Sequence, residues 1–510
     1  MPADRREAEE ADQLRKIIGD CVHCGFCLPA CPTYQLWGEE MDSPRGRIHL
    51  MAQMLDGAQP SRAAAEHLDR CLGCMACVPA CPSGVRYDTL IEAARSWASE
   101  SGETSTVPGD TAPAEGAAPG ATVPAEGAAP AWPPALPPRS RRDRAVRAAI
   151  FATFPYPGRL RLIVGPLRAA QRTGVDRLLR RSTLLDRAAP ELAAALRVAP
   201  RPAPRRTADA EAPVPPLGPR GRLPERVAAR GNRRAVVGML TGCVQRVFFP
   251  QVNIATARVL AAEGCDVVIP ADQGCCGALS LHDGRRAQAA RFARATIETF
   301  ERAGVDAVVI NSAGCGSAMK EYPALLADVP GDRSWAERAE AIAAKVADLS
   351  EFLADLGPTA ARHPLPLTVA YHDACHLAHA QRITRQPRDL LQAIPGLAIA
   401  DIADAGTCCG SAGIYNLVQP RAARELGARK ASAVAATGAD LLVSGNPGCS
   451  LQIAAALGAA GTALPVAHLA EVLDASIHAR RTVSDLRASG TTPDLRASGT
   501  TPDLRASGTT

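Results

Sequence analysis

Residues 21–32 read CVHCGFCLPACP, and residues 71–82 read CLGCMACVPACP. Both stretches space their four cysteines as C-x2-C-x2-C-x3-C and end in proline, and the second follows the first at a constant offset of 50 residues. The eight cysteines are Cys21, Cys24, Cys27, Cys31, Cys71, Cys74, Cys77 and Cys81. Such a run is typical of a [4Fe–4S] site, so the doubled run predicts two clusters.

The spacing within each run suits a cubane cluster, which needs four thiolates at the corners of a tetrahedron. Three closely spaced cysteines can wrap one face of a cluster, but the fourth lies too near along the chain to cap the opposite iron. The runs resemble those of bacterial two-cluster ferredoxins, in which the fourth cysteine of each run ligates the other cluster. The resemblance implies one cluster on Cys21, Cys24, Cys27 and Cys81, and another on Cys71, Cys74, Cys77 and Cys31.

Disulfides and zinc are the alternatives for these cysteines. The first residues, MPADRREAEEADQLRKI, are charged and lack the apolar segment of a signal peptide, which argues against disulfides. A zinc site uses two cysteine pairs and leaves the third cysteine of each run without a role. No run of about 18 apolar residues is present. We therefore expect a cytoplasmic protein, or one that is peripheral on the cytoplasmic face of the membrane.

Length and charge narrow the remaining classes. The chain has 510 residues, enough for about three domains, and its net charge of +5 comes with no nucleic-acid recognition motif. Of its 17 cysteines, all but Cys265 fall into four motifs and are interpreted as ligands. Cys265 lies in an apolar strand-like run and is expected to be a buried core thiol.

The first hundred residues are expected to form an α-helical two-cluster ferredoxin domain. Helical patterns cover residues 5–19, 42–55, 61–70 and 87–99. Ser43-Pro44 is a plausible helix start. Arg45 and Arg47 follow it, and they either offset the negative charge of the clusters or belong to an ordinary solvated helix start.

The middle of the chain and its end have a different composition. Residues 101–140 are rich in Ala, Pro and Gly and predict a disordered linker, and residues 476–510 repeat DLRASGTTP and predict a disordered tail. Residues 141–233 are expected to form a basic helical connector, with two or three helices broken at Pro155, Pro157 and Pro166, followed by a second linker. Its arginine-rich helices either dock a partner or lie on an anionic membrane surface.

From residue 234 the chain repeats itself. Strand patterns at 235–240, 265–270 and 307–310 alternate with helical patterns, and strand patterns at 367–371 and 440–443 follow in a second copy. The copies place corresponding cysteines 132 to 134 residues apart. We expect a duplicated α/β domain with largely parallel sheets, over 234–360 and 361–475, with ligands at the carboxyl ends of the strands.

Each copy offers a single cysteine, a Cys-Cys-Gly triplet and a further cysteine. The two sets are Cys243, Cys275, Cys276 and Cys315, and Cys375, Cys408, Cys409 and Cys449. These motifs resemble the cysteine-rich CCG domain of heterodisulfide reductases and of iron–sulfur subunits of several flavin dehydrogenases. The fullest motif ends in a C-x-x-C pair, but Ala318 and Gln452 stand at the partner positions here. A fifth thiolate is therefore missing in both copies.

The remaining four thiols in each copy leave several interpretations open. They could hold a cubane or a more labile cluster, or form a structural or quinone-proximal site, or remain as a zinc site or reduced thiols. His372, His376 and His379 bracket Cys375 and could ligate a metal, relay protons or simply begin a helix.

Two ferredoxin-type runs, a linker and two CCG domains resemble the bacterial glycolate oxidase iron–sulfur subunit family over about 1–100 and 234–470. The resemblance depends on short sequence motifs such as SPRGRI, HLDRCLGC, SAGCGSAMKEY and CCGSAGIYNL. It implies an electron-transfer subunit that works with FAD-binding subunits, on which glycolate is oxidised to glyoxylate, and that passes electrons to a quinone or other acceptor.

The residues agree with such a division of labour. The sequence has no G-x-G-x-x-G motif after a strand, no P-loop and no catalytic triad, so we expect no catalytic residues here and FAD only on partners. A lactate or glycerol-3-phosphate dehydrogenase subunit, or a heterodisulfide-reductase-like one, is the alternative with the same architecture. A non-redox cluster or zinc protein is the alternative from another class.

Overall fold

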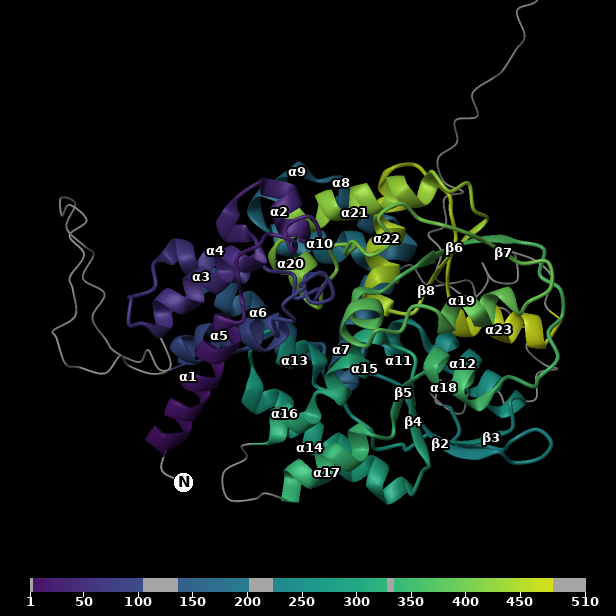
Figure 1. The fold of residues 1–510 in the computed structure, drawn as a ribbon. Helices are drawn as coiled ribbons and strands as arrows, with labels where there is room; N and C mark the ends of the chain where they lie inside the picture. The colour runs from purple at the N-terminus through teal and green to yellow at the C-terminus, as the bar shows by residue number, and fades with distance from the viewer. Residues whose placement is uncertain (1–2, 104–135, 201–222, 328–333, 480–510) are drawn as a thin grey trace, which may run out of the picture.

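The computed structural model describes residues 3–103, 136–200, 223–327 and 334–479 (Figure 1). Most of the predicted 101–140 linker and of the predicted tail lies outside these residues, as does most of the second linker. The described chain forms an N-terminal group of helices, a second group of helices in the basic connector (residues 141–198), and two α/β units. We call the second group the linker helices. In Figure 1 the linker helices lie between the N-terminal helices and the two sheets.

The N-terminal part folds as helices around the two cysteine loops. The elements are α1 (Ala3–Gly19), α2 (Pro32–Trp37), η1 (Glu40–Asp42), α3 (Pro44–Leu55), α4 (Arg62–Asp69) and α5 (Tyr87–Glu103). The predicted helix start is confirmed, because the Ser43 side chain accepts a hydrogen bond from the Gly46 amide and Pro44 occupies the first turn. The helices pack Leu14, Met51 and Leu90 into one core.

The basic connector contains more helices than the sequence predicted. They are α6 (Arg141–Thr153), α7 (Pro157–Thr173), α8 (Val175–Arg181), α9 (Thr183–Ala188) and α10 (Pro190–Val198). The prediction of two or three helices was wrong because a left-handed Gly174, a Ser182 cap and Pro190 create extra helix ends. The predicted break at Pro166 was also wrong. The helix continues through this exposed proline, since Leu162, which loses a hydrogen-bond donor, faces solvent.

The first α/β unit has a five-stranded sheet in the order β1-β3-β2-β4-β5. Its strands are β1 (Arg226–Val227), β2 (Ala235–Leu240), β3 (Cys265–Val268), β4 (Ala307–Ile310) and β5 (Val346–Asp348). All pairs are parallel except β1 with β3. The sheet therefore begins before residue 234. Cys265 is fully buried as predicted, and burial raises its pKa to about 11.

The helices of the first unit cover both faces of its sheet. They are α11 (Gln245–Phe248), α12 (Pro250–Ala262), α13 (Ala278–His282), α14 (Arg286–Ala303), α15 (Ala313–Lys320), α16 (Tyr322–Leu326), α17 (Ser334–Ala343) and α18 (Leu349–Leu356). Parallel strands that run into helices in this way leave the carboxyl ends of the strands free to build a site.

The second unit repeats the arrangement with four parallel strands in the order β7-β6-β8-β9. Its elements are β6 (Thr368–His372), η2 (His376–Ala380), α19 (Gln386–Gln392), β7 (Ala398–Ala400), α20 (Tyr415–Val418), α21 (Pro420–Ala435), β8 (Leu441–Ser444), α22 (Pro447–Ala459), β9 (Val466–His468) and α23 (Leu469–Ile477). The mostly parallel, duplicated architecture predicted from the sequence is confirmed.

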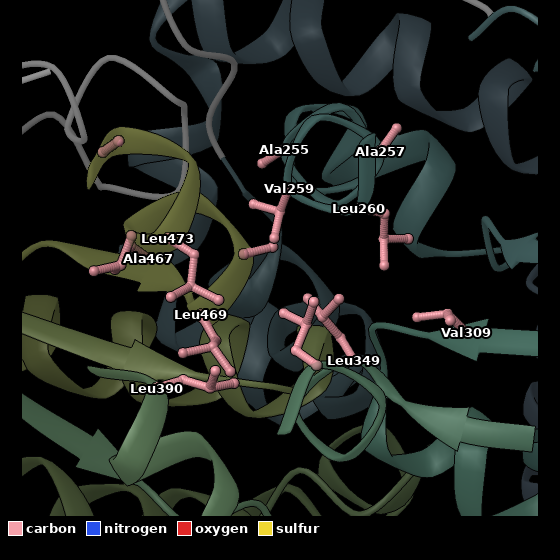
Figure 2. Packing of buried hydrophobic residues seen from close by; sticks show 14 of the residues in the cluster. Ala255, Ala257, Val259, Leu260, Val309, Leu349, Leu390, Ala467, Leu469 and Leu473 are labelled. Carbon is pink, nitrogen blue, oxygen red and sulfur yellow. The ribbon is translucent and has the colours of Figure 1, made fainter. Parts of the chain in front are cut away.

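The two α/β units share one hydrophobic core. Helix α12 of the first unit packs on α23 of the second, and α18 of the first packs on α19 of the second. Figure 2 shows Val259 of α12 near Leu469 and Leu473 of α23 in this core. Helices α12 and α19 follow the corresponding strands β2 and β6, and α18 and α23 follow the corresponding strands β5 and β9. The two helix contacts are therefore related by approximate two-fold symmetry. The interface brings the carboxyl ends of both sheets together, where the His468 Nε2 lies 2.9 Å from the Asn311 carbonyl oxygen.

Candidate iron–sulfur and thiol sites

The two N-terminal cysteine loops have the same backbone form. A left-handed conformation occurs at the second residue after the first cysteine, which is His23 in one loop and Gly73 in the other. It recurs two residues later, at Gly25 and Met75. His23 and Met75 carry side chains at these positive φ angles, which is a strained arrangement that proteins concentrate at functional sites. The loops thus behave as two copies of one cluster-binding turn.

Two cavities in this part of the protein gather the predicted ligands. One is lined by Cys21, Cys24, Cys27, Cys77 and Cys81, and the other by Cys31, Cys71, Cys74 and Cys77. Each cavity therefore contains the first three cysteines of one run and the last cysteine of the other, and Cys77 lines both cavities. This is the grouping that the two-cluster ferredoxin pattern implies. Donor set and location both fit a pair of [4Fe–4S] clusters.

Arginines approach both loops. Arg45 donates a hydrogen bond to the His23 carbonyl at 3.0 Å and lines the first cavity. Arg47 is buried, with 1 % of its surface exposed, and lines the second cavity. Its burial excludes the interpretation of Arg47 as part of a solvated helix start. Arg95, on α5, donates to the Cys71 carbonyl at 2.6 Å, and no local sequence pattern indicated this role.

These charges act on the thiols of the second loop. Burial opposes ionisation of Cys71, but Arg47 and Arg95 outweigh it and lower the pKa of this thiol. Burial raises the pKa values of Cys74 and Cys77. Positive charge is thus concentrated where thiolates and sulfide of a bound cluster would need it.

The four CCG cysteines of each unit also come together. The thiols of the first unit are close enough to influence one another's ionisation in series, in the order Cys243, Cys275, Cys276 and Cys315. The same holds in the second unit for Cys375, Cys408, Cys409 and Cys449. Neighbouring thiols and burial raise the pKa values of Cys275 and Cys375, so these sites are protonated until a metal cation displaces the protons.

The positions of the missing fifth cysteines take no part in either thiol cluster. Ala318 is fully buried in the hydrophobic core of the first unit. The Gln452 amide donates to the Ala423 carbonyl at 2.8 Å and accepts from Asn416 at 3.2 Å. Both positions are therefore occupied by packing or by protein hydrogen bonds.

The three histidines around Cys375 have different surroundings. The His379 Nε2 lies 2.8 Å from the Gly406 carbonyl oxygen, which accounts for that ring. The centroid of the His376 ring lies 4.7 Å from that of His282 in the first unit, with the ring planes tilted by 45°. His372 is buried, one of its ring nitrogens lies within 4.8 Å of the Sγ atoms of Cys409 and Cys449, and burial lowers its pKa to about 3.

The second cysteine loop packs on the second CCG unit and is joined to the first through Arg95 of α5. Cys74 is buried in one hydrophobic cluster with Cys375 and Cys408. Arg95 bridges to the first unit, where it donates to the His282 carbonyl at 2.8 Å. The three parts of the chain therefore meet at the second loop.

A cavity of about 510 Å³ lies at the carboxyl ends of both sheets. Seven CCG cysteines from the two units line it: Cys243, Cys275, Cys276, Cys315, Cys375, Cys408 and Cys449. Apolar side chains of α7 and α10, among them Leu160, Leu167 and Leu196, line it as well. Its size suits a small organic molecule in addition to metal at the thiols.

Comparison with known proteins supports these assignments. A model described as a 4Fe-4S dicluster domain matches residues 17–85, and a cysteine-rich domain matches 237–320 and 369–454. A model described as the linker region of the glycolate oxidase iron-sulfur subunit matches 142–199. Fold, thiol sets and matches define an iron–sulfur electron-transfer protein with a 4Fe-4S ferredoxin-type domain and a duplicated CCG domain.

Relatives that match most of the chain show to which family of iron–sulfur proteins it belongs. The chain is 35 % identical to the probable glycolate oxidase iron-sulfur subunit of Bacillus subtilis, over 89 % of this chain and 93 % of that one. It is 32 % identical to the glycolate oxidase iron-sulfur subunit of Escherichia coli, over 89 % and 94 %. Lactate utilization protein A of Shouchella clausii is 33 % identical over 47 % of this chain and 98 % of that one. The chain belongs to the glycolate oxidase iron-sulfur subunit family.

Proposed function

We propose that this chain is the electron-transfer subunit of a glycolate-oxidising complex, in which a partner subunit carries the flavin and oxidises glycolate to glyoxylate. Family membership and the absence of a dinucleotide-binding motif support this division of labour. The domain limits we propose are those expected from the sequence, except that the first CCG domain includes β1.

The exposure of the two cysteine loops is the observation that carries the proposal. Val22 and Phe26 of the first loop are each 68 % exposed, whereas their counterparts Leu72 and Ala76 are 5 % and 6 % exposed. Exposed apolar residues around a redox site indicate a docking surface. The flavin subunit docks on the first loop, and the buried second loop connects it to the CCG units.

The cluster ligands are the two thiol sets that line the two cavities. [4Fe–4S] clusters, when bound, supply reversible one-electron chemistry whose potential depends on charge, hydrogen bonding and burial. The residues of this chain set those conditions: Arg45 stands beside the first thiol set, and Arg47 and Arg95 stand beside the second.

The electron acceptor is a quinone that binds in the apolar cavity beneath α7 and α10. Thiols of the CCG units and leucines of α7 and α10 both line this cavity, so an aromatic ring with an apolar tail fits its chemistry. No described helix is long and apolar enough to span a bilayer.

We also propose peripheral contact with an anionic membrane through the linker helices. Leu162, Leu178 and Leu184 are 76 %, 74 % and 76 % exposed, and exposed arginines such as Arg161 and Arg177 alternate with them. Apolar side chains flanked by arginines are typical of helices that lie at a membrane surface.

A vesicle-binding experiment tests this membrane contact. We expect the wild type to co-sediment with phosphatidylglycerol vesicles. A Leu162→Ser/Leu178→Ser variant should lose this binding, and Val22→Ser should retain it. Equal binding by all three proteins would exclude this surface.

The test of the main proposal uses the chain purified anaerobically with its flavin subunits. Glycolate should reduce [4Fe–4S] EPR signals, and Phe26→Ser should weaken flavin-subunit association and slow this reduction. Leu184→Ser, an equally exposed residue on the linker helices, should do neither. Reduction by lactate or glycerol 3-phosphate but not by glycolate would instead favour the alternative dehydrogenases.

A further inference from the structure

The two CCG units differ at the last residue of their central strand. Leu240 ends β2 and pairs with Ile310 of β4, whereas His372 ends β6 and pairs with Ser444 of β8. Both positions stand three residues before the first thiol of their unit. The second unit thus has an imidazole where the first has an isobutyl group, and both side chains are buried.

The imidazole of His372 lies beside two thiols and has no hydrogen-bond partner among the described residues. One of its ring nitrogens and the Sγ atoms of Cys409 and Cys449 all lie within 4.8 Å of one another. Neither ring nitrogen makes a hydrogen bond among the described residues, and the neighbouring Ser444 hydroxyl has no partner either. A side chain that is only 1 % exposed and has two unpaired ring nitrogens is costly, unless a bound group completes the site.

The two CCG units also differ in the charge that lies near their thiols. A Cβ on Gly277 would contact Ala289, and one on Gly410 would contact Ala423, so the helices that begin near these contacts correspond. Seven residues further along, the first unit has Thr296 and the second has Lys430. Lys430 is 3 % exposed, and its ammonium group is close enough to interact electrostatically with Cys408, Cys409 and Cys449. Its cation offsets thiolate charge in the second unit, and the first unit has no counterpart at the equivalent position.

We propose that the second CCG unit holds a metal centre with mixed thiolate and imidazole ligation, in which His372 joins Cys409 and Cys449. The histidine takes the place of the fifth thiolate that the chain lacks at Gln452. The first unit offers thiolates alone. Imidazole with thiolate suits zinc, and it also suits an iron–sulfur centre, in which replacing thiolate by histidine raises the reduction potential. The two CCG units are therefore not interchangeable.

The experiment compares metal content and ligand type in the anaerobically purified full chain. Iron and zinc are counted per chain, and X-ray absorption or pulsed EPR with ¹⁵N-histidine labelling detects a metal-bound ring nitrogen. We expect such a nitrogen in the wild type, and at least a roughly tenfold weaker retention of that metal in His372→Leu, which copies Leu240 of the first unit. His379→Gln is the matched control and should change neither, because its ring already bonds to a carbonyl.

His372→Cys separates ligation from general damage. A ligand role predicts that the thiolate keeps the metal, abolishes the nitrogen signal and lowers the potential if the centre is redox-active. The zinc and iron counts decide which metal is present. A wild-type centre without a bound nitrogen, unchanged metal and signal in His372→Leu, or a metal count unaffected by Cys409→Ser and Cys449→Ser would each overturn the proposal.

Discussion

Cys74, in the second ferredoxin-type loop, is buried in the same hydrophobic cluster as Cys375, which follows strand β6 of the second CCG unit. The second loop therefore packs directly against the second thiol cluster, with none of the described helices or strands between them. The first loop is exposed instead, with Cys24 at the surface. Under the proposed function, electrons would enter at the exposed first loop and pass through the buried second loop toward the CCG thiols.

Cross-ligation between the two runs predicts which cysteine variants resemble one another. Cys81→Ser should damage the same cluster as Cys24→Ser, although the two residues belong to different runs, because both line the first cavity. Cys31→Ser should likewise match Cys74→Ser. EPR of the reduced proteins, with iron analysis, checks the grouping. If Cys81→Ser instead resembles Cys74→Ser, each run holds its own cluster.

Arg47 is predicted to raise the potential of the buried cluster. A unit charge at roughly 7 Å in an effective dielectric constant of about 20 is worth about 2 kcal/mol, or roughly 100 mV for one electron. Arg47→Met should therefore lower that potential by a shift of this order in EPR-monitored titration. It should also destabilise the fold, since Asp42, 0 % exposed, loses one of its cationic partners.

Arg45 provides the matched comparison on the same helix. It lines the other cavity and is paired with Glu40 at 2.5 Å, so Arg45→Met should shift the other cluster, and by less. Arg47→Lys keeps the charge and should restore most of the potential. Equal shifts of both clusters in either variant would contradict the placement of these two arginines.

Much of this organisation could be predicted from the sequence, because it depends on local signals. Cysteine spacing, the Ser43 cap and the strand patterns each reside within a few residues, and the structure has the corresponding elements. The residues that join the parts were not predictable in this way. Arg95 and Arg147 are ordinary helix arginines in sequence, and their partners lie far along the chain. His372 stood in a motif, but only strand pairing shows that it corresponds to Leu240.

Arg147 should be a main stabiliser of the junction between the ferredoxin domain, helix α6 and the first CCG unit. It is 4 % exposed and pairs with Asp69 at 3.1 Å, with Asp143 at 2.9 Å and with Asp283 of the first CCG unit. Arg147→Met leaves the buried Asp283 carboxylate, and the partly buried ones of Asp69 and Asp143, with less compensation, and should cost about 3–5 kcal/mol of unfolding free energy in urea. Arg142→Met removes only a half-exposed pair with Glu191 and should cost less than about 1 kcal/mol.

The pH dependence of that loss has a defined sign. Burial raises the pKa of Asp69, but Arg147 and Arg139 outweigh it and lower the pKa to about 2. A carboxyl group whose pKa is lowered by folding stabilises the protein above its unfolded pKa of about 4, and this stabilisation is lost as the pH falls toward 2. The difference between wild type and Arg147→Met should therefore be equal at pH 8 and pH 5 and shrink at pH 3. A difference that grows on acidification would contradict this origin.

Gly284 is predicted to be essential for the contact between the ferredoxin domain and the first CCG unit. It has a φ of +83°, and a Cβ there would lie 2.2 Å from the Arg95 carbonyl oxygen. Gly284→Ala therefore combines backbone strain with a clash against backbone, which must push α5 away from the unit. Gly304 has a φ of +60° with nothing within 4 Å of its Cβ position, so Gly304→Ala carries the strain alone, about 1 kcal/mol. Urea unfolding should show a clearly larger loss for Gly284→Ala, and limited proteolysis should become faster at this junction only in that variant. Matching losses would mean that the close approach at Gly284 contributes nothing to the association of the two parts.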